Sequence, residues 1–171
     1  SERVRMGSQI FHSLAAILRE KGFSTGVGDE GGFAPELVNN EQALKLLVQA
    51  IQAAGFTPGK QVYLAMDIDA SEFYRGGKYY FMSQRMAWTA DKMMRTLSTW
   101  IKKYPLISIE DPLAEDDWGN WQKLTKEVGK NMILVGDDLF VTNVERIQKG
   151  ITEKVANAVL IKPNQIGSLS E

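Results

Sequence analysis

Residues 106–137 read LISIEDPLAEDDWGNWQKLTKEVGKNMILVGD, and this stretch determines the fold class. It opens with the apolar run Leu106–Ile109, continues through an amphipathic segment that starts at Asp116-Asp117 and stops by Gly129, and closes with a second apolar run, Met132–Val135. Short, continuously apolar strands that alternate with amphipathic helices are typical of a parallel sheet covered by those helices. The stretch therefore predicts a β-α-β unit with a right-handed connection.

The same alternation extends along the chain in both directions. Two more apolar runs, Val62–Met66 and Ala158–Ile161, predict further strands, and the irregular stretch Ala70–Arg85 predicts a small hairpin. Four further helices are predicted: Val4–Lys21; one with Asn40 as N-cap, a buried face of Leu44, Leu47, Val48 and Ile51, and an end at Gly55; one from Thr89 to Pro105; and a short one capped by Asn143. The chain is thus predicted to be an α/β protein.

Composition excludes several classes of function. The chain has 171 residues, of which 44% are hydrophobic and 24% charged, so it is globular. Its 20 basic residues against 21 acidic ones leave a net charge of −1, which argues against a general nucleic-acid binder. The absence of cysteine and the presence of one histidine exclude a disulfide framework, a thiolate metal site and a histidine-based triad contained in this chain. No apolar run approaches the length of a membrane span.

A charged residue follows each of the four predicted strands. These residues are Asp67, Glu110, Asp137 and Lys162. Because the carboxyl ends of parallel strands lie at one edge of the sheet, we expect the four side chains to converge on one site, where α/β proteins carry out their chemistry. Three carboxylates at close quarters need protons or a cation, and oxygen ligands suit a hard ion such as Mg²⁺. Taken singly, each acid is better explained as a helix N-terminal residue; the combination favours a metal site.

A fifth candidate residue is Glu30, in the glycine-rich segment Gly26–Phe33. Glycines in such a segment let the backbone approach a ligand closely, although a loop with solvated acids explains it equally well. The Gly-Lys-Ser/Thr ending of a phosphate-binding P-loop is missing. We predict a strand at Gly26–Glu30, which would bring the parallel strands to five.

Five ordered motifs of the chain closely resemble enolase, the phosphopyruvate hydratase family. The matching segments are Gly28–Pro35; Asp67 with Ser71–Tyr74; Ser108–Pro112 with Glu115–Trp118; Gly136–Leu139 with Val141–Asn143; and Leu160–Lys162 with Asn164–Gly167. The resemblance implies a (β/α)₈ TIM-type barrel of the enolase superfamily, with roughly five of its eight strands present. It also implies a lyase that dehydrates 2-phosphoglycerate to phosphoenolpyruvate in glycolysis.

The resemblance further implies a role for each site residue. Asp67, Glu110 and Asp137 match the Mg²⁺ ligands, Lys162 the base that takes the C2 proton, and Glu30 the acid that helps the C3 hydroxyl to leave; Glu30, Glu110, Asp137 and Lys162 would contact the substrate. A lysine base combined with Mg²⁺ is the general pattern of the superfamily. The family further implies a homo-oligomer in the cytoplasm, with some bacterial members also at the cell surface. The charge balance and the short apolar runs predict no nucleic acid as a partner and no membrane span.

Two alternatives remain open from the residues alone. The first is another superfamily member, such as a racemase or cycloisomerase, although these typically have a Lys-x-Lys motif where this chain has Asp29-Glu30. The second is a non-catalytic fragment or half-barrel. An eight-stranded barrel needs about 250 residues, so we expect residues 1–171 to be an incomplete barrel domain of a longer protein. The N-terminal α+β domain and the last strands would be missing, and this chain alone would be inactive or nearly so.

Overall fold

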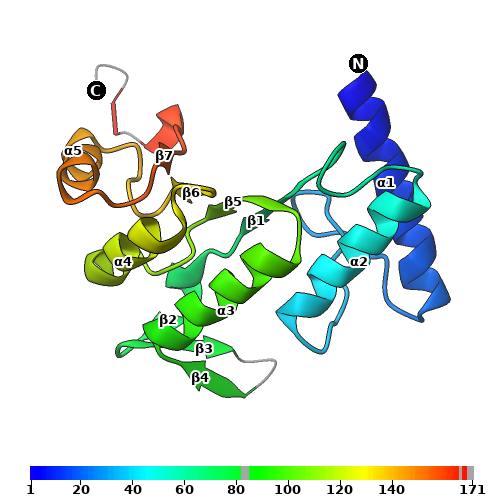
Figure 1. Cartoon of the computed structure of the whole chain (residues 1–171), viewed down its shortest axis with the longest axis horizontal. Coiled ribbons are helices and arrows are strands. Elements are labelled where there is room, and N and C mark those ends of the chain that lie inside the picture. Colours follow the sequence, from blue (N-terminus) through cyan, green and yellow to red (C-terminus); the bar gives the residue numbers. More distant parts are fainter. Residues whose placement is uncertain (82–84, 166, 169–171) are drawn as a thin grey trace. The chain divides into compact units, whose positions relative to one another are not determined.

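The computed structural model of the protein describes residues 1–81, 85–165 and 167–168. The chain divides into two compact units, residues 1–64 and residues 65–171 (Figure 1). Two long helices dominate the first unit, whereas strands and helices alternate along the second. The expected hairpin includes residues 82–84, and the last enolase-like motif includes Ile166; these positions lie outside the described residues.

The first unit contains α1 (Glu2–Glu20) and α2 (Asn40–Ala53), which pack against each other. Both helices were predicted, but the N-cap of α2 is Asn39, whose Oδ1 accepts a hydrogen bond from the Gln42 backbone N–H at 3.0 Å. The sequence alone does not show which of the two adjacent asparagines, Asn39 or Asn40, caps the helix. The buried apolar residues of α2 are Leu44, Leu46, Ala50 and Ile51, whereas Leu47 and Val48 are half-buried. Apolar residues surround much of this helix, so spacing does not fix which edge faces inward.

The predicted strand at Gly26–Glu30 does not form in the described residues. The segment is instead one arm of a tight hairpin, in which the Gly28 N–H donates to the Gly32 carbonyl at 2.9 Å and the Ala34 N–H to the Gly26 carbonyl at 3.0 Å. Gly31 has a φ of +81°, a conformation that glycine adopts without steric cost. Gly31 therefore allows the chain to reverse at this point.

The second unit is built on a parallel sheet with the strand order β1-β5-β6-β7. The strands are β1 (Leu64–Asp67), β5 (Leu106–Glu110), β6 (Ile133–Gly136) and β7 (Ala158–Val159). These are the four predicted apolar runs, and β7 is shorter than predicted. The α/β class and the partial-barrel architecture are therefore confirmed, with four parallel strands in the described residues where five were expected.

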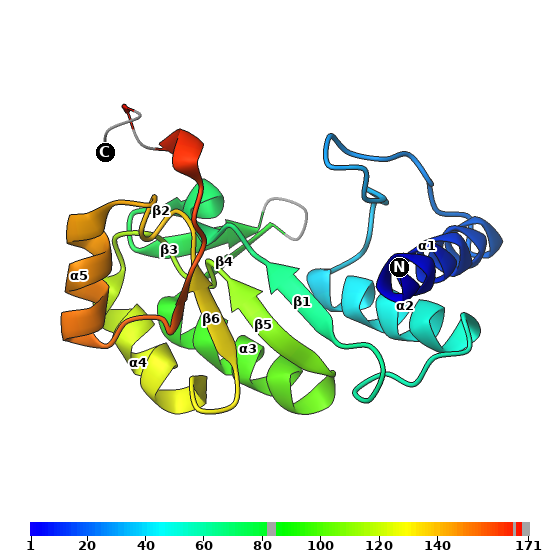
Figure 2. The same cartoon turned by 90° about the horizontal axis from the view of Figure 1, so that it is seen from above.

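Three helices lie along one face of this sheet, as Figure 2 shows. They are α3 (Ala90–Lys103), α4 (Trp118–Val128) and α5 (Val144–Glu153), capped at Thr89, Asp117 and Asn143. Ile109 and Leu134, which are paired in the register of β5 and β6, are fully buried on the face that these helices cover. Ile133 points to the other face and is 45% exposed. The helices therefore bury alternate residues of each strand, and the residues between them face the opposite side.

A second, antiparallel sheet follows β1. It consists of β2 (Tyr74–Arg75), β3 (Lys78–Phe81) and β4 (Met86–Trp88), preceded by the 3₁₀ turn Ala70–Phe73. The small hairpin expected within Ala70–Arg85 is confirmed, and it gains a third strand. Tyr79 on β3 is fully buried, and Phe81 lies against Phe73 and Trp88. This sheet therefore has its own aromatic core.

Candidate active site

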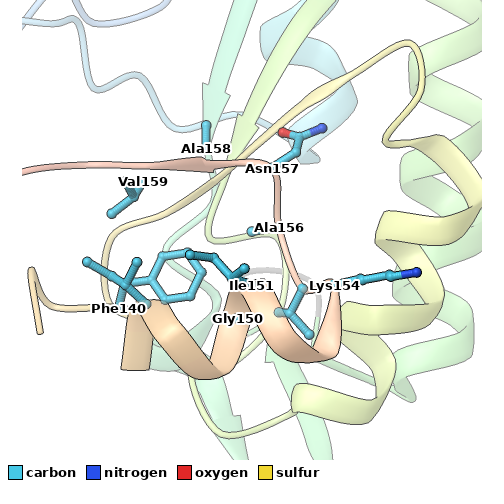
Figure 3. A pocket seen from close by; sticks show the side chains of 10 residues that line it. Phe140, Gly150, Ile151, Lys154, Ala156, Asn157, Ala158 and Val159 are labelled. Atoms are coloured by element: carbon cyan, nitrogen blue, oxygen red, sulfur yellow. The ribbon is translucent and has the colours of Figure 1, made fainter. Parts of the chain in front are cut away.

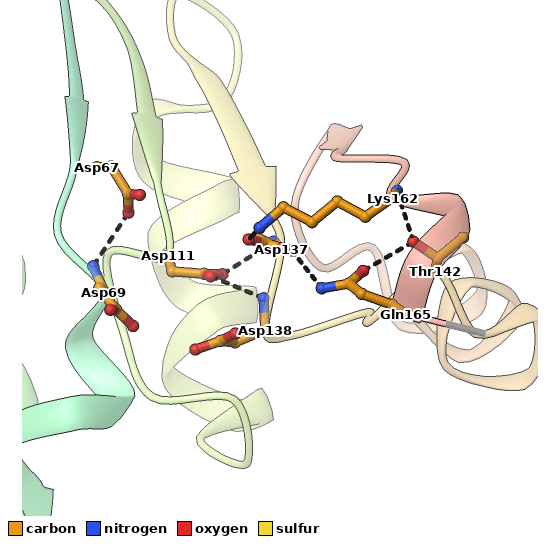
Figure 4. Close-up of polar contacts among 8 residues, drawn as sticks. All are labelled: Asp67, Asp69, Asp111, Asp137, Asp138, Thr142, Lys162 and Gln165. Carbon is orange, nitrogen blue, oxygen red and sulfur yellow. Dashed lines mark hydrogen bonds and ion pairs between the residues drawn. The ribbon is translucent and has the colours of Figure 1, made fainter. Parts of the chain in front are cut away.

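The four charged residues predicted at the strand ends lie together at the carboxyl edge of the parallel sheet. Asp67 and Glu110 are the last residues of β1 and β5, Asp137 directly follows β6, and Lys162 lies shortly after β7. Glu110 is paired with Val135, and Val135 with Ala158, so Asp137 and Lys162 continue the same alternation of sides as Glu110. Asp67, Asp137 and Lys162 are drawn in Figure 4. Because the strands are parallel and in this register, the four residues that are far apart in the sequence form a single cluster.

The acidic groups of this cluster act on one another electrostatically. Burial raises the pKa of Asp67, and the negative charge of Asp137 raises it further. Burial also raises the pKa of Glu110, with additional repulsion from Asp67 and Asp137, while the positive charge of Lys162 lowers it. Carboxylates that repel one another at a partly buried edge are stabilised by a bound cation. The edge therefore favours positive charge.

Lys162 supplies such a charge in this structure. Its Nζ forms an ion pair with Asp137 Oδ2, and this bond raises the pKa of Lys162. The Asp137 side chain is 11% exposed and the Lys162 side chain 43% exposed. The other carboxylate oxygen, Asp137 Oδ1, accepts a hydrogen bond from Gln165 Nε2 at 2.9 Å. Both oxygens of Asp137 therefore have partners.

Asp111 connects three strand ends, a role that the sequence reasoning missed. Its buried carboxylate accepts hydrogen bonds from the backbone N–H groups of Asp137 at 3.1 Å and Asp138 at 2.8 Å. Its own N–H donates to the Val135 carbonyl at 3.0 Å, and its carbonyl accepts from the Ala70 N–H at 3.2 Å. Asp111 has a φ of +37°, which is strained for a residue with a side chain. Burial raises its pKa to about 6.

A group of three carboxylates in the described residues could hold a metal ion. Asp111, Asp137 and Asp138 each offer one oxygen, and these oxygens lie within 4.8 Å of one another. The group shares Asp137 with the predicted ligand set of Asp67, Glu110 and Asp137. Since the Asp111 oxygens accept backbone hydrogen bonds, we interpret Asp111 as a support for the site rather than as a ligand.

Asp138 takes part in a second carboxyl pair. Its side chain interacts electrostatically with that of Asp69, which has a φ of +49°. Burial raises the pKa of both groups, and the negative charge of Asp69 raises that of Asp138 further. Asp69 also donates its backbone N–H to Asp67 Oδ1 at 3.2 Å. The negative charge at this edge therefore extends beyond the predicted residues.

Glu30, the fifth predicted residue, belongs to the first compact unit. It lies at the exposed tip of the hairpin at residues 26–34. Within the second unit, the structure brings together Asp67, Glu110, Asp137 and Lys162, which lie in strands of the parallel sheet or shortly after them.

The loop that follows Glu110 is held by residues of the small sheet and the turn before it. The Tyr79 hydroxyl accepts a hydrogen bond from the Ala114 N–H at 3.1 Å and donates one to Asp117 Oδ2 at 3.2 Å. Ser71 Oγ accepts from the Glu115 N–H at 3.0 Å. Burial raises the pKa of Tyr79, so its hydroxyl stays protonated. These contacts fix the loop that begins at Asp111.

A cavity of about 390 Å³ lies apart from the charged cluster, between α5 and β7 (Figure 3). Apolar groups dominate its lining, which consists of Phe140, Ile147, Gly150, Ile151, Lys154, Val155, Ala156, Asn157, Ala158 and Val159. None of the predicted site residues contributes to it. The cavity therefore adds nothing to the chemistry at the strand ends.

The fold and the site together define an α/β barrel-type protein with an acidic edge at the ends of its parallel strands. The family model described as the enolase C-terminal TIM barrel domain matches residues 1–171, and the chain belongs to that family. The chain is 54% identical over 170 residues to Enolase 2 of Pseudomonas syringae pv. syringae (strain B728a) and to Enolase 2 of Pseudomonas syringae pv. tomato (strain ATCC BAA-871 / DC3000). Each alignment covers 99% of this chain and 40% of the relative.

These comparisons place the chain in an enzyme family of lyases of the enolase superfamily. The chain spans 40% of the length of these relatives. Among the described residues, none of the helices has both the length and the apolar character to cross a membrane.

Proposed function

We propose that the protein carrying this chain is a Mg²⁺-dependent phosphopyruvate hydratase, which dehydrates 2-phosphoglycerate to phosphoenolpyruvate in glycolysis. The observation that carries the proposal is the cluster of Asp67, Glu110, Asp137 and Lys162 at one edge of the parallel sheet. Membership of the enolase family and the names of the two relatives support the same reaction over racemisation or cycloisomerisation.

The donor set at this edge fits a hard divalent cation. Asp67, Glu110 and Asp137 offer oxygen ligands. Burial and repulsion between carboxylates raise the pKa values of Asp67 and Glu110. Asp137 already forms an ion pair with the positively charged Lys162. These three residues would hold Mg²⁺. When bound, the ion would orient the substrate carboxylate and stabilise the negative charge that develops as C2 loses its proton.

The proton transfers are assigned to Lys162 and Glu30. Lys162 Nζ would take the proton from C2, and Glu30 would give a proton to the C3 hydroxyl, which leaves as water while the C2–C3 double bond forms. A base must be neutral, whereas the ion pair with Asp137 raises the pKa of Lys162 and favours its charged form. We infer that this pair separates in the working enzyme, so that Asp137 serves the cation and Lys162 the substrate. Glu30, Glu110, Asp137 and Lys162 would line the substrate site.

The remaining properties are proposed from the family. We propose a cytoplasmic homo-oligomer that binds a small phosphorylated acid, does not bind nucleic acid and has no membrane span; the net charge of −1 argues against nucleic-acid binding. Residues 1–171 would be an incomplete barrel domain, because a closed barrel takes about 250 residues. The 171-residue chain alone would therefore be inactive or nearly so, and the full-length protein active.

The experiment compares the full-length protein with the 171-residue chain, using the ultraviolet absorbance of phosphoenolpyruvate as the readout. We expect turnover by the full-length protein with Mg²⁺, its loss in chelator, and a decrease of about 10²- to 10⁴-fold in Lys162→Met. Glu110→Gln should lose Mg²⁺ dependence and activity together. The matched control is Glu115→Gln in the loop after β5, which should retain activity. A full-length protein without Mg²⁺-dependent turnover would refute the proposal.

A further inference from the structure

Thr142 occupies an unusual position in the turn between β6 and α5. Its φ is +54° and that of Val141 is +42°, a region that β-branched residues rarely adopt. The turn is held by the backbone carbonyl of Asp137, which accepts hydrogen bonds from the N–H groups of Phe140 at 3.1 Å and Val141 at 2.7 Å. The residue that directly follows β6 thus holds the turn that carries Thr142.

The Thr142 hydroxyl closes a ring of polar contacts around the candidate site (Figure 4). Thr142 Oγ1 accepts a hydrogen bond from the backbone N–H of Lys162 at 2.9 Å and donates one to Gln165 Oε1 at 2.8 Å. Gln165 Nε2 donates to Asp137 Oδ1 at 2.9 Å, and Lys162 Nζ pairs with Asp137 Oδ2. One hydroxyl therefore connects the carboxylate of Asp137 to the backbone of Lys162.

Beyond the end of β7, the hydrogen bond to Thr142 replaces the hydrogen bonds of the sheet. β7 ends at Val159, and the N–H of the next residue, Leu160, still donates to the Gly136 carbonyl at 3.1 Å. Lys162 lies two residues further on, and its N–H donates to Thr142 instead of to the neighbouring strand. Pro163 follows and has no N–H of its own. Thr142 thus supplies the hydrogen bond that fixes the chain direction at Lys162.

We propose that Thr142 is a positioning residue, which holds the Asp137 carboxylate through Gln165 and the Lys162 backbone directly, so that both keep one orientation whether or not Lys162 Nζ is paired with Asp137. The Gln165 amide fixes one oxygen of Asp137, so the other oxygen points to the place shared by Lys162 and a cation. The inference rests on the proposed function, because it assigns Asp137 to the cation and Lys162 to the substrate. Thr142 itself contacts neither the cation nor the substrate in this assignment.

The test uses four variants of the full-length protein. Thr142→Val keeps the shape and the β-branch of the side chain but removes the hydroxyl, and Thr142→Ser restores the hydroxyl. Gln165→Met removes the amide without altering the turn, so it tests the ring even where Thr142→Val folds poorly. Thr152→Val is the matched control, because the Thr152 hydroxyl donates to the Gln148 carbonyl on the exposed side of α5. Circular dichroism and thermal melting check that each variant is folded.

Two readouts distinguish positioning from a general structural role. The first is Mn²⁺ affinity without substrate, measured by electron paramagnetic resonance, and the second is the separation of kcat from KM with 2-phosphoglycerate. Loss of a group that orients a metal ligand typically lowers affinity or activity by about 10- to 100-fold. We expect such losses in Mn²⁺ affinity and kcat for Thr142→Val and Gln165→Met, a smaller change in KM, recovery in Thr142→Ser and wild-type values for Thr152→Val.

The outcomes separate the inference from the function on which it rests. A wild-type enzyme that is active, together with folded Thr142→Val and Gln165→Met variants within about twofold of it in both readouts, would overturn the inference and leave the function intact. Failure of Thr142→Ser to recover would also overturn it, since the hydroxyl would then not be the cause. A wild-type protein that neither binds Mn²⁺ nor turns over 2-phosphoglycerate would refute the proposed function, and the positioning role with it.

Discussion

The contact between β3 and the loop after β5 yields a sharp prediction about stability. Tyr79→Phe keeps the buried ring but removes the hydroxyl, leaving the Ala114 N–H without its 3.1 Å partner. Asp117 loses a bond of 3.2 Å but retains Asn120 Nδ2 at 2.9 and 3.0 Å. The dominant effect is therefore one buried, unsatisfied donor, which costs about 1–3 kcal/mol. Because phenylalanine fills nearly the same space, no cavity contribution adds to this value.

The free energy of unfolding can be measured by urea titration with tryptophan fluorescence. All four tryptophans lie in the second unit, so the signal reports on the unit that contains Tyr79. We expect Tyr79→Phe to be less stable by about 2 kcal/mol. The control is Tyr80→Phe on the same strand, where the side chain is 41% exposed and the change should stay within about 0.5 kcal/mol. A loss below about 0.5 kcal/mol for Tyr79→Phe, or equal losses for both variants, would refute the reasoning.

Two further predictions concern packing and pH. In Gly150→Ala, the new Cβ would lie 2.5 Å from Cε1 of the Phe140 ring, so we expect a loss of about 1–3 kcal/mol in urea unfolding. Gly119→Ala on α4, where nothing lies within 4 Å, should be neutral or stabilising; a neutral Gly150→Ala would contradict the packing argument. In chelator, the raised pKa of Asp111 means that the folded protein binds a proton more tightly than the unfolded chain does, so stability should rise as pH falls through about 6. The pKa shift of Asp111 from 3.8 to about 6 corresponds to at most about 3 kcal/mol of unfolding free energy. Asp111→Asn should therefore flatten the dependence of the melting temperature on pH. An unchanged dependence in this variant would exclude Asp111 as its cause.

The sequence predicted the parts of the molecule that depend on periodicity. Apolar runs located the four parallel strands, helical spacing located the five long helices, and Asn143 was recognised as an N-cap. The candidate site followed from these predictions, because parallel strands bring their carboxyl ends to one edge. For the same reason Asp67, Glu110, Asp137 and Lys162 could be grouped before any coordinates were considered.

The supporting contacts could not be predicted, because they depend on loop conformations that have no repeating pattern. Asp111 reaches the N–H groups of Asp137 and Asp138 from a left-handed backbone conformation, for which an aspartate before a proline gives no clear signal. Thr142 reaches Lys162 from a similarly disfavoured conformation. In the glycine-rich segment Gly26–Glu30 a strand was predicted that does not form, because the segment is one arm of a hairpin.

The order of the strands explains why support is concentrated on Asp137. β6 lies between β5 and β7, so the residue that follows it can be held from both sides. Asp111 holds its backbone N–H from the β5 side, and Gln165 and Lys162 hold its carboxylate from the β7 side. Asp67 is the last residue of β1, which lies at the end of the strand order, and its carboxylate receives the longer 3.2 Å contact from the Asp69 N–H. Asp137 is therefore the pre-oriented member of the proposed ligand set, whereas Asp67 is freer to adjust as a ligand binds.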